Sequence, residues 1–197
     1  MRTVRVKAVH RCSLFVLLCL AGPLAHAHPG HEAASLSFFQ GLVHPLLGLD
    51  HLLAMLIVGV WAAQIGGRAR VWLPASFVAL MAIGALAPHA ANLPTMEGGI
   101  VVSLLALGLA VALAWRAALP LAIPLVGLFA LFHGAAHGIE LQQLAHPLFY
   151  ASGFLIQTAA LHLVGLALGA YAQRRDSRLA RAAGWLGVVV GAGLALG

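Results

Sequence analysis

The sequence predicts an all-α protein that crosses a membrane several times. Of its 197 residues, 62% are hydrophobic and 8% are charged, whereas a soluble domain has roughly 25% charged residues. Long apolar runs alternate with short polar segments along the chain. Because backbone amides in lipid must be satisfied within their own segment, each apolar run is expected to be a helix.

The N-terminus predicts a cleaved signal peptide over residues 1–27. Basic residues precede the apolar run CSLFVLLCLAGPL, and AHA follows at 25–27, which is the pattern of a secretory signal with its cleavage site. An uncleaved signal anchor is the alternative, although the run is short for a span. Cleavage removes Cys12 and Cys19, so the mature chain has no thiolate to offer a metal. Its 7 arginines against 5 acids leave a small positive charge that gives no indication of nucleic-acid binding.

Residues 28–197 are predicted to form one transmembrane domain with lipid around it. Spans need about 20 apolar residues each, and the arginines follow only the first, third and fifth apolar runs. Because short cytoplasmic loops carry the excess of Arg and Lys, this places both termini outside, in the periplasm, if the membrane is the bacterial cytoplasmic membrane. Six spans are predicted: 36–63, 71–88, 98–115, 119–140, 147–172 and 182–197.

The many glycines predict close helix packing. They recur in GGIVVSLLALGLA, GLALGA and GVVVGAG, and small residues let membrane helices approach closely. A general tolerance of membrane helices for glycine is the alternative. Small-residue faces also allow copies of the chain to form a homo-oligomer.

The first predicted span contains an unusual set of polar side chains. In HPLLGLDHLLAM, His44 and His51 are seven residues apart and share one helix face, Met55 lies one turn after His51, and Asp50 is about 100° away from His51. An ionisable group at this depth costs about 2.5–3.5 kcal/mol, so it is expected to face the bundle interior and to have a partner.

The fourth span supplies the expected partners. In FHGAAHGIE, His133, His137 and Glu140 lie on one face, and Gly134 and Gly138 leave room for a neighbouring helix. Other candidate ligands are His162 in span five, Glu97 at the outer start of span three, and His28 and His31 at the predicted mature N-terminus; Phe77 is a candidate for narrowing a path through span two. For His162 the alternative is an interhelical hydrogen bond, and for His28 and His31 it is a tail with no function.

Imidazole and carboxylate donors without thiolate suit Ni²⁺, Co²⁺ or Zn²⁺ better than Cu⁺. If span one is a continuous helix, His44 lies about 12 Å and His51 about 22 Å below its outer start. Donors at different depths predict successive stops on a transport path, whereas a storage or catalytic site would gather them at one level.

The quoted segments HPLLGLDH, LLAMLIVGVWA and FHGAAHGIE, together with AHAHPGHE at the start, resemble the HupE/UreJ family of nickel/cobalt permeases. The resemblance implies uptake of Ni²⁺ or Co²⁺ as a substrate across the bacterial cytoplasmic membrane, with no prosthetic group and no enzymatic reaction. By motif position it assigns the metal path to His44, Asp50, His51, His133, His137 and Glu140.

Two other functions remain as alternatives. An intramembrane metal-dependent hydrolase would use HGAAH, but Gly134 follows the first histidine where a general-base glutamate is needed. A bis-histidine haem protein would use His51 with His162 or His137 as axial ligands, which leaves the buried acids without a role. A purely structural protein is the third possibility. No nucleotide-binding motif is visible, so ATP hydrolysis by this chain is not expected.

Overall fold

The structure is a computed structural model, and it describes residues 29–86 and 93–196. The chain divides into two units, 1–32 and 33–197, and the architecture below is that of the second unit. The predicted signal peptide, both cysteines and His28 lie outside the described residues. The signal peptide therefore stays a prediction.

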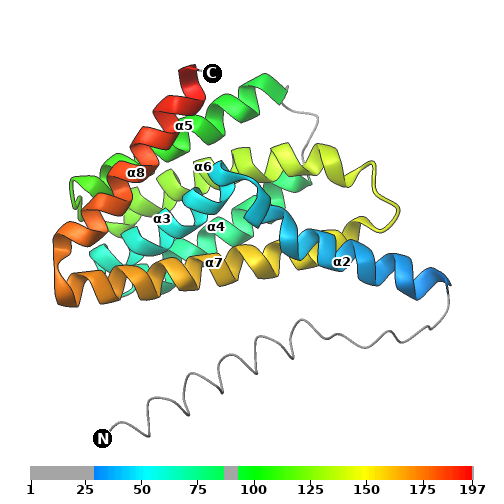
Figure 1. The fold of residues 1–197 in the computed structure, drawn as a ribbon, viewed down its shortest axis with the longest axis horizontal. Coiled ribbons are helices and arrows are strands. Elements are labelled where there is room, and N and C mark those ends of the chain that lie inside the picture. Colours follow the sequence, from blue (N-terminus) through cyan, green and yellow to red (C-terminus); the bar gives the residue numbers. More distant parts are fainter. Residues whose placement is uncertain (1–28, 87–92, 197) are drawn as a thin grey trace, which may run out of the picture. The chain divides into compact units, whose positions relative to one another are not determined.

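Every regular element in the two described ranges is an α-helix, as the sequence predicts (Figure 1). Four helices are long and apolar enough to cross a membrane, and the bent pair α2–α3 makes a fifth if it is one span; α4, with 17 residues, is shorter. A multi-pass helical membrane protein is therefore confirmed, and the count of six spans stays a prediction. The helices are α2 (Pro29–Leu47), α3 (Leu49–Ile65), α4 (Ala69–Ala85), α5 (Leu93–Ala112), α6 (Leu119–Leu141), α7 (Pro147–Arg175) and α8 (Ser177–Leu196).

The first predicted span is not one straight helix, and this part of the prediction is wrong. Helix α2 ends at Leu47, α3 begins at Leu49, and the two are bent by 80°. Pro45 lies in the last turn of α2, where its ring and missing N–H disturb the helix, and Gly48 has an extended backbone, with φ −90° and ψ 114°. His44 and His51 therefore belong to different helices, and the depths calculated for a continuous helix do not apply.

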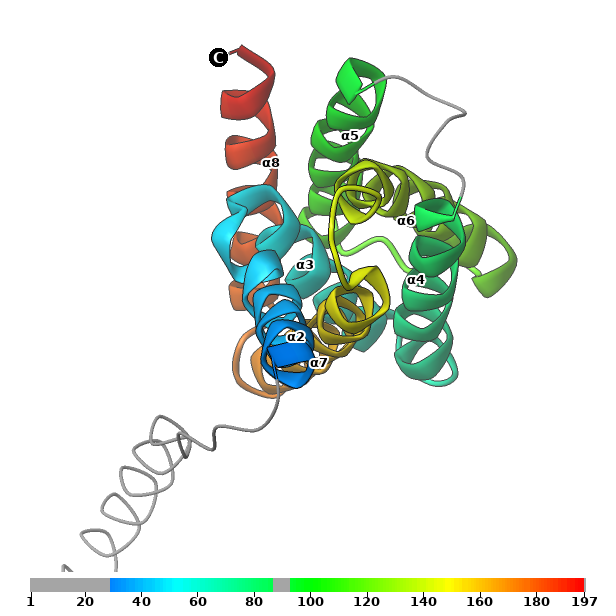
Figure 2. The same ribbon diagram turned by 90° about the vertical axis from the view of Figure 1, so that its right-hand side faces the viewer.

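Three helix pairs carry the tightest packing: α4 with α6, α3 with α7, and α5 with α8. Glycines lie in each seam, as predicted. A Cβ on Gly134 would overlap a backbone carbonyl of α4, one on Gly165 would overlap a carbonyl of α3, and one on Gly184 would meet the backbone of α5. Figure 2 shows α3, α4, α6 and α7 around a common centre, with α5 and α8 beside them.

The directions of the paired helices follow from which residues meet in each seam. Leu56 and Val60 of α3 meet Gly165 and Gly169 of α7 in the same order, so α3 and α7 run parallel. Helices α4 and α6 also run parallel by the same criterion, whereas α5 and α8 run antiparallel. These directions are expected if each helix from α4 to α8 crosses the membrane in the direction opposite to that of the helix before it.

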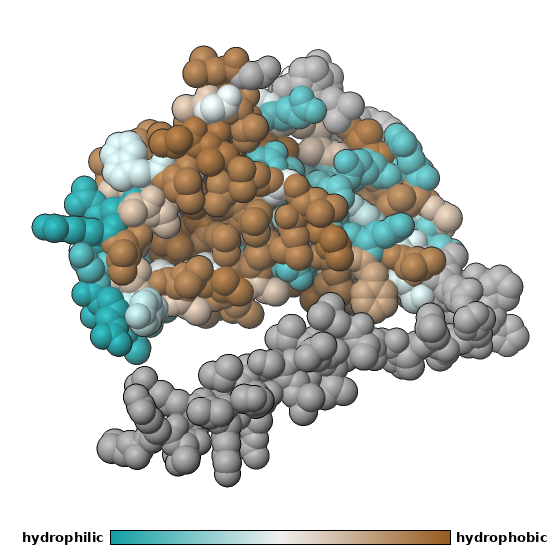
Figure 3. Space-filling view, viewed as in Figure 1, coloured by the Kyte–Doolittle hydropathy of each residue, from teal (hydrophilic) through white to brown (hydrophobic). Residues whose placement is uncertain are grey.

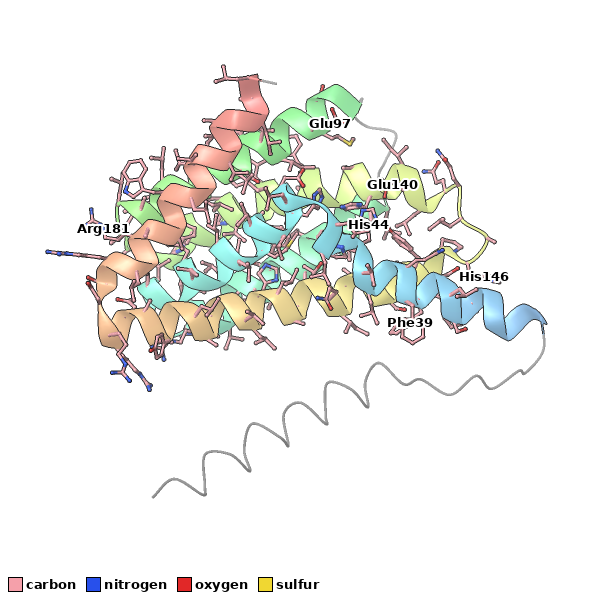
Figure 4. The ribbon with its side chains drawn as sticks, viewed as in Figure 1. Phe39, His44, Glu97, Glu140, His146 and Arg181 are labelled. Carbon is pink, nitrogen blue, oxygen red and sulfur yellow. The ribbon has the colours of Figure 1, made fainter. Side chains whose placement is uncertain are left out.

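The arginines gather at one end of the bundle, where α3, α5 and α7 end and α4, α6 and α8 begin. Figure 3 shows a hydrophobic band across the middle of one face and a hydrophilic group at its left-hand end. Arg181 lies at this end in Figure 4, opposite to Glu140 and Glu97. Its Nε donates a hydrogen bond of 2.7 Å to the carbonyl of Ala112 at the end of α5, which suits the partial negative charge of a helix C-terminus.

Candidate metal site

The site forms where the bend between α2 and α3 meets the C-terminal half of α6. α2 supplies His44 in its last turn, and α3 supplies Asp50 and His51 in its first turns. α6 supplies His133, His137 and Glu140 from its second half. Because α6 runs antiparallel to α3, this half lies beside the first turns of α3. The bend therefore brings together side chains that a straight helix would have separated along its length.

Three of these side chains form a compact donor group. His44 Nε2 lies 3.6 Å from Glu140 Oε2, and His137 Nδ1 lies 3.3 Å from the same oxygen. One ligand atom from each residue lies within 4.8 Å of the others. Bonds of about 2.0–2.2 Å to a first-row divalent ion put neighbouring donors about 3.0–3.5 Å apart, so donor atoms that all lie within 4.8 Å of one another can hold one ion after a small adjustment.

A second contact joins α3 to α6 below this group. His51 Nε2 and His137 Nε2 lie 2.7 Å apart, and the two rings have centroids 4.5 Å apart. The Asp50 carboxylate does not point about 100° away from His51 around the helix axis, as helical spacing alone suggests. Its carboxylate turns back, so that Oδ1 lies 3.0 Å from His51 Nδ1 and accepts the His51 backbone N–H at 2.8 Å.

Asp50, His51, His137 and Glu140 form a continuous series of hydrogen-bond contacts. The number of hydrogens in this series leaves a place for one positive charge between the two imidazoles. Without an ion, a carboxylate only accepts, so the Nδ1 atoms of His51 and His137 each carry a hydrogen for Asp50 and Glu140. In neutral rings both Nε2 atoms then present lone pairs to one another at 2.7 Å. A cation or one extra proton between them satisfies both. The His137 hydrogen must leave Nδ1 before that nitrogen can share an ion with Glu140.

His133 extends this arrangement inward. Its ring is fully buried, its centroid is 4.9 Å from that of His51, and its Nδ1 donates a hydrogen bond of 2.9 Å to the Phe129 carbonyl. Its Nε2 is therefore a lone pair, and it has no hydrogen-bond partner among the described residues. Metal-binding histidines usually have this pattern, with one nitrogen held by a carbonyl or carboxylate and the other directed to the metal.

Phe77 separates His133 from a further histidine. The Phe77 ring centroid lies 5.4 Å from that of His133 and 5.0 Å from that of His162. Both ring nitrogens of the fully buried His162 and the hydroxyl of Thr158, one turn earlier, have no hydrogen-bond partner within the described ranges. His162 thus lies beyond the aromatic ring and is not part of the donor cluster, which consists of His44, Asp50, His51, His133, His137 and Glu140.

The other predicted ligands are placed differently. Met55 is completely buried one turn after His51. Glu97 is exposed on α5 and lies apart from His44 and Glu140 in Figure 4. His31 falls within α2, but its side chain, like His28, is outside the described part of the chain. The segment after His28 is helical from Pro29.

Two aromatic residues of α7 were not anticipated from the sequence. Phe154 packs on His137 and His44, with ring centroids 4.3 Å and 5.8 Å apart, and Tyr150 lies 5.7 Å from His44. Their spacing of one helical turn at the start of α7 was the available signal. These rings fix the planes of the two imidazoles.

A cavity of about 420 Å³ opens beside His137. Its wall is almost entirely apolar and comes from α4, α6 and α7. A second groove of about 520 Å³ runs along α2 and reaches His44 and Tyr150. The donor cluster therefore lies between two openings at the same end of the bundle.

A family model described as HupE / UreJ protein matches residues 16–195. The chain belongs to the HupE/UreJ family. Among curated proteins, Protein HupE of Rhizobium leguminosarum bv. viciae is 42% identical over 186 residues, which cover 92% of this chain and 95% of that protein. No solved structure matches the chain. The family resemblance that the motifs predict is thus confirmed, and the structure shows how this member of the HupE/UreJ family brings HPLLGLDH and FHGAAHGIE together.

Proposed function

We propose that the protein takes up Ni²⁺ or Co²⁺ as its substrate across the bacterial cytoplasmic membrane. The observation that carries the proposal is the contact of imidazoles and carboxylates from α2, α3 and α6 inside a membrane bundle. Family membership supports the same substrate class, and the donor set has only nitrogen and oxygen, which suits these ions. Such a permease carries no prosthetic group and catalyses no reaction.

The contacts suggest an order of binding along the path. The ion first meets the group formed by His44, His137 and Glu140. It then reaches the facing Nε2 atoms of His137 and His51, with Asp50 behind His51. His133 is next, followed by the Phe77 ring and His162. Several modest sites in series favour transport, because the ion must leave each site as well as bind it.

Residues outside the cluster have subsidiary roles in this proposal. Glu97 attracts cations at the outer mouth, His28 and His31 collect them near the N-terminus, and Met55 offers a weak sulfur ligand below His51. With both termini in the periplasm, the arginine end faces the cytoplasm. The membrane potential then favours inward movement of a dication by about 4.6 kcal/mol per 100 mV.

The test is uptake of radioactive nickel and cobalt by cells that produce the wild type, Asp50→Asn or His137→Ala. We expect both variants to lose most of the uptake, because each removes a donor or a charge from the cluster. His146→Ala is the matched control, since His146 lies at the start of α7 and contacts Phe149 rather than the cluster. Equal accumulation in wild type, Asp50→Asn and His137→Ala would remove the proposed roles of these residues.

A further inference from the structure

Gly48 lies at the break between α2 and α3, and its backbone conformation does not explain why a glycine is present there. Its φ of −90° and ψ of 114° lie in the extended region that any residue adopts. It is also not in a helix seam, where a glycine allows two backbones to approach. Another reason is needed for a residue without a side chain at this point.

The space beside the Gly48 Cα is taken by the polar pair of α3. A Cβ built on Gly48 would lie 2.8 Å from Asp50 Oδ1 and 3.4 Å from His51 Nδ1. These are the two atoms that form the 3.0 Å contact between Asp50 and His51. The third nearest atom, His51 Cβ, is at an ordinary distance of 3.7 Å. A methyl group here would therefore press on the carboxylate and not on a neighbouring helix.

This environment differs from that of the seam glycines. A Cβ on Gly165 would collide with backbone atoms of α3, which cannot move without separating two helices. The atom closest to a Cβ on Gly48 is the end of a short side chain, which can rotate. Substitution of Gly48 should thus change the position of the carboxylate while leaving the helices packed.

We propose that Gly48 is a positioning residue for the metal path: the absence of a side chain there leaves the room in which the Asp50 carboxylate holds His51 Nδ1. His51 is thereby turned with its Nε2 toward His137. The inference rests on the proposed function, because it assigns Gly48 a role through Asp50 and His51. The site then includes a glycine, which has no side chain and supplies no side-chain donor to the metal.

The test combines uptake kinetics, metal binding and stability for Gly48→Ala, Asp50→Asn and the double variant. Gly193→Ala is the matched control, because nothing lies within 4 Å of a Cβ at Gly193. Loss of one well-placed hydrogen bond corresponds to about a fivefold effect. We expect Gly48→Ala to raise the apparent KM for nickel by about that factor, at an unchanged amount of protein in the membrane. Gly193→Ala should behave like the wild type.

Binding of Co²⁺ to the purified proteins separates positioning from a structural role. The visible absorption of bound Co²⁺ in Gly48→Ala should shift toward that of Asp50→Asn, and the double variant should bind Co²⁺ no more weakly than Asp50→Asn alone. The thermal midpoint of Gly48→Ala in detergent should match that of Gly193→Ala.

A wild-type KM and Co²⁺ spectrum in Gly48→Ala would overturn the positioning role. So would a lowered thermal midpoint with loss of Vmax alone, because that result indicates a structural role. Additive weakening in the double variant would also overturn it. If Asp50→Asn itself transports and binds like the wild type, the proposed function of the cluster fails. If only Gly48→Ala is normal, the proposed function stands without Gly48.

Discussion

Three imidazoles of the cluster, those of His51, His133 and His137, are each oriented by a partner of Nδ1, on the side away from Nε2. Asp50 holds Nδ1 of His51, and the Phe129 carbonyl holds Nδ1 of His133. Glu140 lies 3.3 Å from Nδ1 of His137. These partners fix which nitrogen of each ring faces the neighbouring donors, so the cluster is arranged before any ion binds.

Protons should compete with the metal for these rings. A histidine binds a divalent ion only as the neutral imidazole, and its ordinary pKa is about 6.5. Uptake of nickel by vesicles at a fixed free nickel concentration should therefore fall as the external pH is lowered from about 7.5 to 5.5. Uptake that stays constant over this range would show that histidine ligation does not limit transport.

The identities of the donors were predictable from the sequence, but several of their contacts were not. Residues such as His137 and Glu140 stand out because polar groups are expensive within an apolar segment. The turn of the Asp50 carboxylate onto His51 depends on a side-chain rotamer and on the space at Gly48. Helical spacing alone gives only the direction of the Cα–Cβ bond, so it placed Asp50 on another face.

At the scale of the helices, glycine seams set the distances across which the donors meet. Gly134 and Gly138 flank His137 on α6, and both would collide with α4 if they carried a Cβ. Gly59, Gly165 and Gly169 bring α3 and α7 together in the same way. Close approach of the backbones keeps His51 and His133 in a narrow interior between four helices.

Gly165→Ala should destabilise the bundle. The added Cβ overlaps backbone atoms of Leu56 on α3, so the two helices must separate. Overpacking of this kind costs about 1–3 kcal/mol. A lower thermal midpoint of the purified protein in detergent than for Gly193→Ala is the expected result, and equal midpoints would show that the α3–α7 seam tolerates a methyl group.

The helix boundaries could be predicted from the sequence only in part. Residues 119–140 and 147–172 were predicted within a few residues, because Pro and Arg mark their ends clearly. The bend at Gly48 was missed because hydropathy continues across Pro45 and Gly48, and an apolar run does not record the angle between its two halves. The contact of His44 with α6 follows from that angle.

At the scale of the whole transmembrane unit, charge is separated along the bundle. Exposed arginines lie at one end, whereas the donor cluster and Glu97 lie toward the other. Helix directions in all three tight pairs agree with alternate crossing. If the arginine end faces the cytoplasm, as we propose, a dication entering at the cluster and leaving at the arginine end would move down the membrane potential.

Reporter fusions test this orientation. A phosphatase that is active only outside the cytoplasm should be active when fused after residue 196 and inactive when inserted between α5 and α6, next to Arg116. The reason is the retention of arginine-rich loops on the cytoplasmic side. The reverse pattern of activity would mean that the cluster faces the cytoplasm and that the proposed direction of transport is wrong.

X-ray absorption at the nickel edge of the purified, nickel-loaded protein measures whether imidazoles of the donor cluster bind the ion. We expect a first shell dominated by nitrogen and oxygen, with the outer-shell scattering of imidazole from more than one histidine, and a clear loss of that scattering in His137→Ala but not in His146→Ala. A shell made of water alone, or a spectrum unchanged by His137→Ala, would contradict this expectation.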